Sequence, residues 1–387
     1  MYNFDILSQI NKNIFKFFFN FLLVVYFYKL YFEYSIPITG DELNSILVYS
    51  SNIKTLFLKN FPHNAVFFHL IGFIKSIIFN FELYSFRIIT FIFIILHFYI
   101  IKKLNYDELR LSLFFILILS SSFSLYGGMY IGYIFSSSIF VTIFYLIHSN
   151  NDNNKLIFFL LFIQTYTHLV NIYLVIPILL VMMITSNKKK FLLNAIFYFG
   201  IPLSIFYSFS IILSGLSVLK ISDISISGVL EFIFKNYENI IIKGFNTIFF
   251  SPYISEGKEF TLVESLKEIL FFDKFIFLIL VSTFLAIIIN LLYKKNLILT
   301  YILIIHFLLF VIINKHPPPR IFTGFFCFYI LYSLTLLENI RYEKFIQLIK
   351  YFCIVLLLFT MAKFNYKKIH GNSKKHVDAN YEENIIT

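Results

Sequence analysis

The stretch PITGDELNSILVYSSNIKTLFLKNFPHN, residues 37–64, separates the first long apolar run of the chain from the second. It holds two adjacent carboxylates, Asp41 and Glu42, and it ends in Pro62, His63 and Asn64. An ionised acid beside a membrane costs free energy unless water or a partner stabilises it. We therefore expect this stretch to carry a site, in which Asp41 is a general base held just outside the bilayer.

The composition predicts a polytopic membrane protein. Of the 387 residues, 59% are hydrophobic and only 14% are charged, whereas about 25% of the residues of a soluble domain are charged. The net charge of +11 would suggest a nucleic-acid partner for a soluble chain. Here the basic residues flank apolar runs, where they set topology and meet lipid phosphates. We therefore expect membrane lipid around the chain and no nucleic acid.

The apolar runs predict an all-α fold of about eleven transmembrane helices, because a helix needs about 20 residues to cross a bilayer. The first run lacks a small-residue cleavage site, so we expect a retained helix. The sixth is long enough for two helices, with a break near Thr167 and His168. The runs are 14–33, 65–80, 86–101, 111–127, 130–148, 156–185, 191–213, 275–292, 297–314, 321–337 and 346–361.

Basic flanks predict the orientation, and the strongest cytoplasmic marker is Lys188–Lys190. Counting back with one long sixth helix places residues 37–64 outside, and counting forward places 214–274, 315–320 and the tail outside. This count also leaves Lys102, Lys103 and Arg110 outside, against the positive-inside tendency. If the sixth run forms two helices, the predicted side of the membrane is inverted for every segment before it. Further inside markers are Lys294, Lys295, Arg341 and Lys344.

Three polar regions interrupt the apolar runs. The loop 34–64 carries apolar residues at helical spacing and predicts two short amphipathic helices on the membrane surface. The large loop 214–274 has similar segments, and the tail 362–387 is polar. We expect residues 1–213 to form the catalytic transmembrane module, followed by the outward loop 214–274, the C-terminal helices 275–361 and the tail.

Acidic pairs are the first candidates for chemistry. Asp41 and Glu42 suit a catalytic pair, and the alternative is a helix N-cap with an acid in the first turn. Asp107 and Glu108 form a second pair with basic neighbours, so we interpret them as a solvated loop. A supporting or metal-binding role for this second pair is the alternative.

Histidines at the ends and breaks of apolar runs are the next candidates. His63 lies where the chain re-enters the membrane, and a neutral imidazole there can donate to a phosphate or a sugar hydroxyl; an interfacial histidine without a role is the alternative. His168 is either buried and satisfied or lines a cavity. His69 is interpreted as a packed helix residue.

The segment Lys315-His316-Pro317-Pro318-Pro319-Arg320 is the second distinct feature. Its prolines end a span and keep the loop extended. A guanidinium at the opening of the next span suits a bidentate phosphate contact, and a snorkelling charge that sets topology is the alternative. Cys327 and Cys353 lie in apolar runs and are expected to be small core residues, since the chain has no CxxC, HExxH, Walker or GxGxxG pattern.

The order of these segments resembles that of the GT-C membrane glycosyltransferases, which include protein O-mannosyltransferases and aminoarabinose transferases. That family has an outward loop with an Asp-Glu pair after its first span, as in GDELNS here, and a re-entry similar to 63–68. It has an arginine at the opening of its third span, similar to Arg87 in ELYSFRIIT. Thr167-His168-Leu169, Pro319-Arg320-Ile321 and the loop 214–274 are similar to later features of the family.

The resemblance implies transfer of a sugar from a polyprenyl phosphate to an envelope lipid, polysaccharide or protein, on the outer face of a bacterial plasma membrane. Asp41 would be the base and Glu42 its partner. No cofactor is required, and a divalent metal ion at Asp41 and Glu42 is compatible with the chemistry. The residues expected to bind carrier phosphate or substrate are His63, Arg87, His168, Lys315, His316 and Arg320.

Two other function classes fit a polytopic chain. A polysaccharide polymerase or ligase relies on arginine and histidine in a large outward loop, and 214–274 contains neither. A lipid-linked sugar flippase or transporter is expected to show internal symmetry and paired discontinuous spans, and the sequence shows neither.

Overall fold

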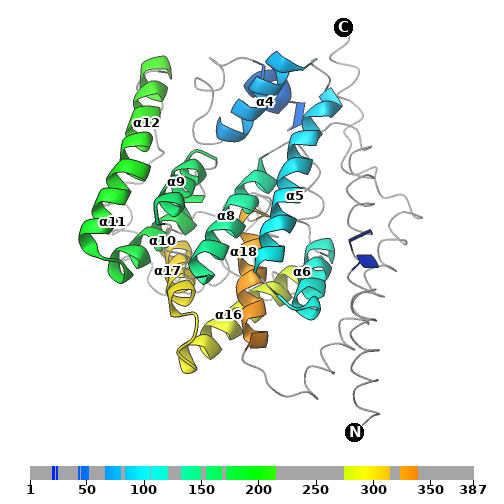
Figure 1. Ribbon diagram of the computed structural model, residues 1–387, viewed down its shortest axis with the longest axis vertical. Helices are drawn as coiled ribbons and strands as arrows, with labels where there is room; N and C mark the ends of the chain where they lie inside the picture. The colour runs from blue at the N-terminus through cyan, green and yellow to red at the C-terminus, as the bar shows by residue number, and fades with distance from the viewer. Residues whose placement is uncertain are drawn as a thin grey trace.

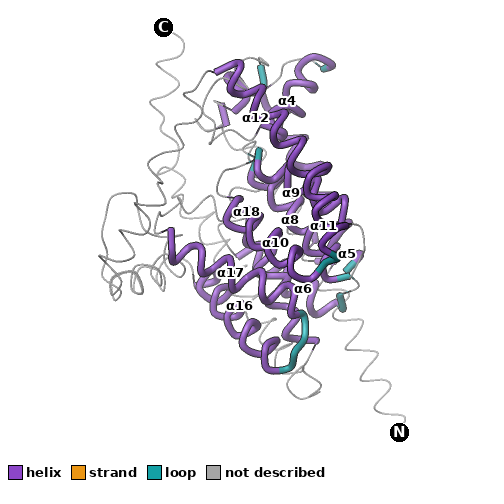
Figure 2. Tube along the Cα trace, turned by 90° about the vertical axis from the view of Figure 1, so that its left-hand side faces the viewer, coloured by secondary structure: helices purple, strands orange, loops and turns teal. Residues whose placement is uncertain are grey.

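The computed structural model describes residues 20–21, 23–24, 42–43, 45–51, 66–79, 83–104, 106–120, 132–149, 154–167, 171–214, 274–313 and 323–338. Within these residues every regular element is a helix, and none is a strand (Figure 2). The all-α prediction is therefore confirmed for the described part of the chain. The last apolar run, 346–361, and the polar regions 214–274 and 362–387 lie outside it, apart from Ser214 and Lys274 at the edges of the large loop.

The helices follow the apolar runs to within a few residues. This agreement arises because apolar length sets most of the helix positions, while side-chain caps mark the starts of α6, at Asp107, and of α11, at Asn187. The elements are η1 (Ser45–Tyr49), α4 (Val66–Ile78), η2 (Leu83–Phe86), α5 (Arg87–Lys103), α6 (Glu108–Ser120), α8 (Tyr133–His148), α9 (Asn154–Thr165), α10 (Ile172–Thr185), α11 (Lys188–Ala195), η4 (Ile196–Gly200), α12 (Ile201–Ser214), α16 (Lys274–Leu292), α17 (Leu297–Ile313), α18 (Thr323–Leu334) and η7 (Thr335–Glu338).

The sixth apolar run forms two helices, α9 and α10, so the orientation count that used one long helix is wrong at this point. The backbone amides of Tyr166 and Thr167 donate to the carbonyls of Ile163 and Gln164, three residues back, which tightens and ends α9. Asn171 then donates from its amide to the carbonyl and the side-chain oxygen of Gln164, at 3.2 and 2.7 Å. The break therefore falls where the sequence predicts it.

Helix α8 occupies the middle of the bundle, between α5 and α18 (Figure 1). Its aromatic side chains pack on both neighbours, with ring centroids 4.7 Å apart for Phe135 and Phe93 and 5.2 Å apart for Phe144 and Phe328. Most residues of α8 are buried. The three helices run in the same direction, because residue numbers rise together along both contacts.

Buried polar side chains tie α8 to α5, α9 and α10. Ser136 donates to Gln164 at 3.1 Å and to Asn171 at 3.3 Å. Ser137 and Ser138 lie 3.2 and 2.9 Å from the two ring nitrogens of His97. A polar group in an apolar interior costs free energy unless it finds a partner, so these contacts fix how the helices are arranged.

A second set of polar contacts joins α10, α17 and α18. His306 of α17 lies 2.6 Å from the backbone oxygen of Tyr173 and 2.5 Å from the hydroxyl of Tyr329. Near the start of α17 and the end of α18, the hydroxyls of Thr300 and Tyr332 are 2.7 Å apart. Each helix of this group is therefore linked to a neighbour by at least one buried hydrogen bond.

One end of the bundle, called here the η1 end, gathers η1, α4, η2 and the start of α5 (Figure 1). The backbone amide of Val66 donates to the carbonyl of Tyr166 at 3.1 Å, so α4 begins where α9 ends. Phe68 packs against Phe93 and Phe135, near the starts of α5 and α8. Helix α4 has 13 residues and spans about 20 Å, and in Figure 1 it lies across the long helices.

The opposite end, called here the lysine end, gathers the α5–α6 turn, the start of α11 and the α16–α17 turn (Figure 1). Tyr106 donates to the carbonyl of Leu331 at 3.3 Å, and Asn290 donates to Thr335 at 3.1 Å, so these turns meet the end of α18. Its basic residues are Lys102, Lys103, Arg110, Lys188, Lys189, Lys190, Lys294 and Lys295, and all except the half-buried Arg110 are exposed.

In the described residues one helix, Lys188–Phe206, is both long and apolar enough to cross a membrane alone, by length and composition. It joins α11, η4 and the start of α12, and only 6% of its apolar window is buried inside the protein. Its exposed residues include Leu192, Phe197 and Ile201. Shorter apolar helices, among them α4, α8, α9 and α10, form part of the bundle beside it.

Candidate functional site

Glu42 and Arg87 form a buried ion pair at the η1 end. The Nε and Nη2 atoms of Arg87 donate to Oε1 and Oε2 of Glu42, each over 2.6 Å. The two side chains are 2% and 0% exposed. A guanidinium and a carboxylate that meet through two parallel hydrogen bonds form the strongest and most directional of the common ion pairs. The pair therefore holds Glu42 against the start of α5.

Arg87 is the first residue of α5, and its position is set by the junction between η2 and α5. The short helix Leu83–Phe86 leads directly into α5, and Phe86 is fully buried. Lys75 of α4 donates to the Ser85 hydroxyl, and its ammonium lies 4.2 Å from the centroid of the Phe86 ring. This contact ties α4 to the two residues that precede Arg87, so the junction is held from both sides.

The segment after Glu42 is also fixed against α4. Ser50 donates to the backbone oxygen of Ser45 at 2.9 Å and lies 3.4 Å from Nδ1 of His69. The ring of His69 stacks on Tyr49 with centroids 5.2 Å apart. Ser76 of α4 reaches the backbone oxygen of Ser50 at 3.4 Å. Glu42 and η1 therefore belong to one packed unit with α4 and the start of α5.

Several predicted site residues lie outside the described residues, so the structure does not place them. They are Asp41, His63, His168, Lys315, His316 and Arg320. The chain next to three of them is described: Glu42 follows Asp41, Thr167 precedes His168, and α18 begins at Thr323, three residues after Arg320. Of the site residues predicted from the sequence, the structure brings together Glu42 and Arg87.

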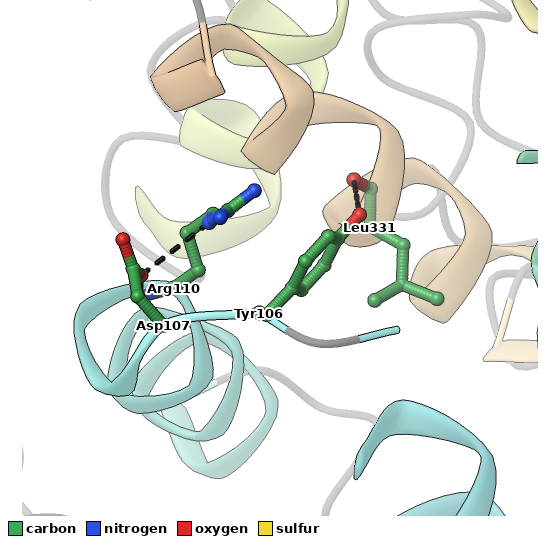
Figure 3. A network of polar contacts seen from close by, with 4 residues as sticks. All are labelled: Tyr106, Asp107, Arg110 and Leu331. Carbon is green, nitrogen blue, oxygen red and sulfur yellow. Dashed lines mark hydrogen bonds and ion pairs between the residues drawn. The ribbon is translucent and has the colours of Figure 1, made fainter. Parts of the chain in front are cut away.

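The second acidic pair lies at the lysine end. Asp107 is 60% exposed and accepts hydrogen bonds from the backbone amide of Arg110 at 2.8 Å and from its Nε at 3.3 Å (Figure 3). It therefore caps the first turn of α6, as expected for a short acidic side chain there. Tyr106 beside it points toward α18 and donates to Leu331 (Figure 3). These contacts favour the solvated interpretation of Asp107.

Three buried or half-buried polar residues make structural contacts that the sequence does not predict: Lys75 at the η2–α5 junction, and His97 and His306 inside the bundle. The only sequence signal is that each is a polar residue within an apolar run, which is rare and costly in a membrane. Within the described residues no group of three or more histidine, cysteine or acidic side chains is arranged to hold a metal ion.

Comparison with known proteins adds no relative: no protein family, curated protein or solved structure matches this chain.

The arrangement at the η1 end offers one carboxylate whose two oxygens are engaged by a guanidinium. Two charge-assisted hydrogen bonds of this kind fix the orientation of the carboxylate. The contacts of Glu42 therefore suit a structural role, in which its carboxylate joins its own segment to the start of α5.

Proposed function

We propose that this chain is a multi-pass membrane glycosyltransferase of the GT-C type. It transfers a sugar from a polyprenyl phosphate carrier to an envelope acceptor on the outer face of the membrane, with Asp41 as the general base. The observation that carries the proposal is the buried pair of Glu42 and Arg87. These residues are 45 positions apart, and the resemblance to the GT-C family picked out both as parts of one site.

The long helix Lys188–Phe206 supports the membrane part of the proposal. Its apolar side chains are exposed along its length, and water around so much contiguous apolar surface would be unfavourable. Lipid tails can surround this apolar surface without the free-energy cost that water would impose. The helix begins with Lys188, Lys189 and Lys190, which suit the headgroup region. We therefore place this helix at the lipid-facing edge of the bundle.

The same proposal assigns the η1 end to the outside and the lysine end to the cytoplasm. The number of membrane crossings between Glu42 and Lys188 is the same as in the count made from the sequence. One crossing is added because α9 and α10 are separate helices, and one is removed because α4 stays at the η1 end. Counting back from Lys188 then returns Glu42 and Arg87 to the outside together. It also moves Lys102 and Lys103 to the cytoplasmic side, which removes the exception to the positive-inside rule.

The proposed reaction needs few groups. The acceptor hydroxyl gives its proton to the Asp41 carboxylate while its oxygen attacks the anomeric carbon. The bond between that carbon and the phosphate oxygen breaks, and the phosphate leaves with the electron pair, so no general acid is needed. Cations stabilise the leaving phosphate, and the proposal gives this role to Lys315 and Arg320. Inversion at the anomeric carbon follows, as in an inverting glycosidase.

Mass spectrometry of the envelope glycans and the lipid-linked sugars tests the proposal, comparing wild type with Asp41→Asn at matched membrane abundance. We expect a polyprenyl-phosphate sugar to accumulate and one glycan residue to disappear. Asp107→Asn is the matched control, since it makes the same chemical change at the lysine end and is expected to leave both pools unchanged. If both pools are unchanged in Asp41→Asn cells, Asp41 is not the catalytic base, and its role is that of a helix cap.

A further inference from the structure

We propose that α12 is a lid that swings on η4, so that the η1 end of the bundle opens sideways toward lipid. In Figure 1, α11 and α12 run on as one long helix at the edge of the bundle, with η4 between them. The movement goes beyond the proposed function, and the lipid around the lid rests on the membrane part of that proposal.

The backbone hydrogen bonding changes in the middle of this helix. The amide of Ile201 donates to the carbonyl of Ile196, five residues back, so η4 is a wide π-helical turn. Such a turn inside an α-helix often marks a functional site. Pro202 follows directly and has no N–H to donate, which removes a further helical hydrogen bond. The hydrogen-bond ladder is therefore interrupted where α11 meets α12, as in helices that bend.

The two halves of the helix pack on different clusters of side chains. The α11 half packs on the main core, where the ring of Phe191 lies 5.3 Å from that of Phe158 of α9. Leu203 and Phe206 of α12 pack on a separate cluster at the η1 end. The buried members of that cluster are Val66, Phe162 and Tyr166. Because the boundary between the two clusters coincides with η4, α12 can leave its cluster while α11 stays in place.

Ring contacts of Phe206 hold the lid in its closed position. The centroid of its ring lies 5.1 Å from that of Phe67, and 5.4 Å from those of Phe162 and Tyr166. The hydroxyl of Tyr166 also donates to the Leu203 carbonyl over 3.5 Å, which is a long and weak hydrogen bond. These aromatic contacts are the latch of the lid.

Opening the lid exposes apolar side chains to an apolar surrounding. The cluster beneath α12 consists of aliphatic and aromatic residues. Lipid tails are as apolar as leucine, so the hydrophobic effect does not keep the lid closed in a membrane. The outer face of α12, with Ile201 and Ile205, is exposed already. The closed and open positions therefore differ mainly in ring packing, which lets both be populated.

Distances between pairs of spin labels in lipid nanodiscs test the movement. In a parent without Cys327 and Cys353, one pair of labels replaces Lys295 of the lysine end and Ser208 of α12. A control pair replaces Lys295 and Lys189 of α11, and all three labelled positions are exposed. We expect two distances for the Ser208 pair, one of them that of the closed structure, and one distance for the Lys189 pair.

Substitutions at the latch and at the hinge should shift the two populations in opposite directions. We expect Phe206→Ala to raise the ratio of open to closed about tenfold, because three ring contacts are lost. Phe79→Ala is the matched control at a 65% exposed phenylalanine and should leave the ratio unchanged. Pro202→Ala returns an amide donor to the helix and should lower the ratio at least about threefold. If Phe206→Ala does not accumulate, Phe206→Leu removes the ring contacts and keeps apolar bulk, with the ratio expected to rise.

One narrow distance for the Ser208 pair in both the parent and the Phe206 variant overturns the inference. A second distance in the Lys189 pair also overturns it, since the movement would then not occur at η4, and so does an equal effect of Phe79→Ala. Failure of the membrane placement has a separate signature, because the protein would not enter nanodiscs. Failure of the transferase appears in Asp41→Asn cells, whatever α12 does.

Discussion

At the level of single residues, the buried ion pair of Glu42 and Arg87 is the charged contact of the η1 end. Removing one partner of a buried pair costs about 3–5 kcal/mol, because the other charge stays buried and alone. We predict that Arg87→Gln lowers the free energy of unfolding by this amount, measured by thermal unfolding of the detergent-solubilised protein. Arg110→Gln, in a partly exposed pair with Asp107, should cost at most about 1 kcal/mol. Equal losses in the two variants would contradict the buried pair.

The contact between His306 and Tyr329 gives a second residue-scale prediction. The Tyr329 hydroxyl lies 2.5 Å from Nε2 of His306 in the core, so Tyr329→Phe leaves the imidazole without this partner. Hydrogen bonds between helices in membranes contribute about 0.6 kcal/mol, with a maximum near 1.7. We predict a loss of about 1 kcal/mol in the same unfolding measurement. Tyr301→Phe, which changes a 45% exposed tyrosine of α17, the helix that carries His306, should change nothing, and a similar loss there would refute the assignment.

The sequence identifies Glu42 and Arg87 separately but cannot pair them. They are 45 residues apart, and the pairing depends on α4 staying at the η1 end, which no local pattern encodes. Lys75 was missed for the same reason, since its role appears only when α4 lies against the η2–α5 junction. By contrast, the cap made by Asp107 could be interpreted from its neighbours alone, because its partner Arg110 is three residues away.

At the level of elements, α4 decides how the chain is oriented. With 13 residues, α4 is as long as α6, which is counted as a crossing helix, so its position and not its length sets it apart. Its contacts with η1, with the end of α9 and with the η2–α5 junction place it at one end of the bundle. We therefore treat α4 as a helix that enters and leaves on the same side.

Cysteine accessibility tests this orientation. In a background without Cys327 and Cys353, single cysteines replace exposed residues before and after α4, at Ser51 and Phe79, and at Lys189 and Lys295 of the lysine end. We predict that a membrane-impermeant maleimide labels Ser51→Cys and Phe79→Cys in intact cells, and labels Lys189→Cys and Lys295→Cys only after lysis. Labelling of Ser51→Cys and Phe79→Cys from opposite sides would show that α4 crosses the membrane.

Helix positions were predictable because apolar length determines them. The runs 275–292 and 297–314 predict α16 and α17 almost residue for residue. The break in the sixth run was visible as a polar cluster around Thr167, but the sequence could not decide whether it ends a helix. The deciding contacts are those from Asn171 to Gln164, which hold a sharp turn that a periodic pattern does not reveal.

At the level of the whole molecule, exposed lysines mark one end of the bundle, and the buried ion pair lies at the opposite end. The exposed lysines gather where α5, α11 and α16 meet the lysine end, and the buried pair of Glu42 and Arg87 lies at the η1 end. Positive-inside topology then sends the proposed base outward, where a lipid-linked sugar donor is expected. The proposal keeps the direction that the sequence count predicts, because the two departures from that count, at α4 and in the sixth run, cancel.

The claim that this protein breaks a sugar–phosphate bond, rather than only moving a lipid across the bilayer, is the central one. Purified protein in proteoliposomes, supplied with the polyprenyl-phosphate sugar from Asp41→Asn cells and with envelope acceptor, tests it directly. We predict that wild type releases free polyprenyl phosphate in step with glycosylated acceptor, and that Asp41→Asn releases neither while Asp107→Asn matches wild type. If wild type instead moves the intact lipid-linked sugar between leaflets and releases no polyprenyl phosphate, the protein is a flippase and the transferase account is wrong.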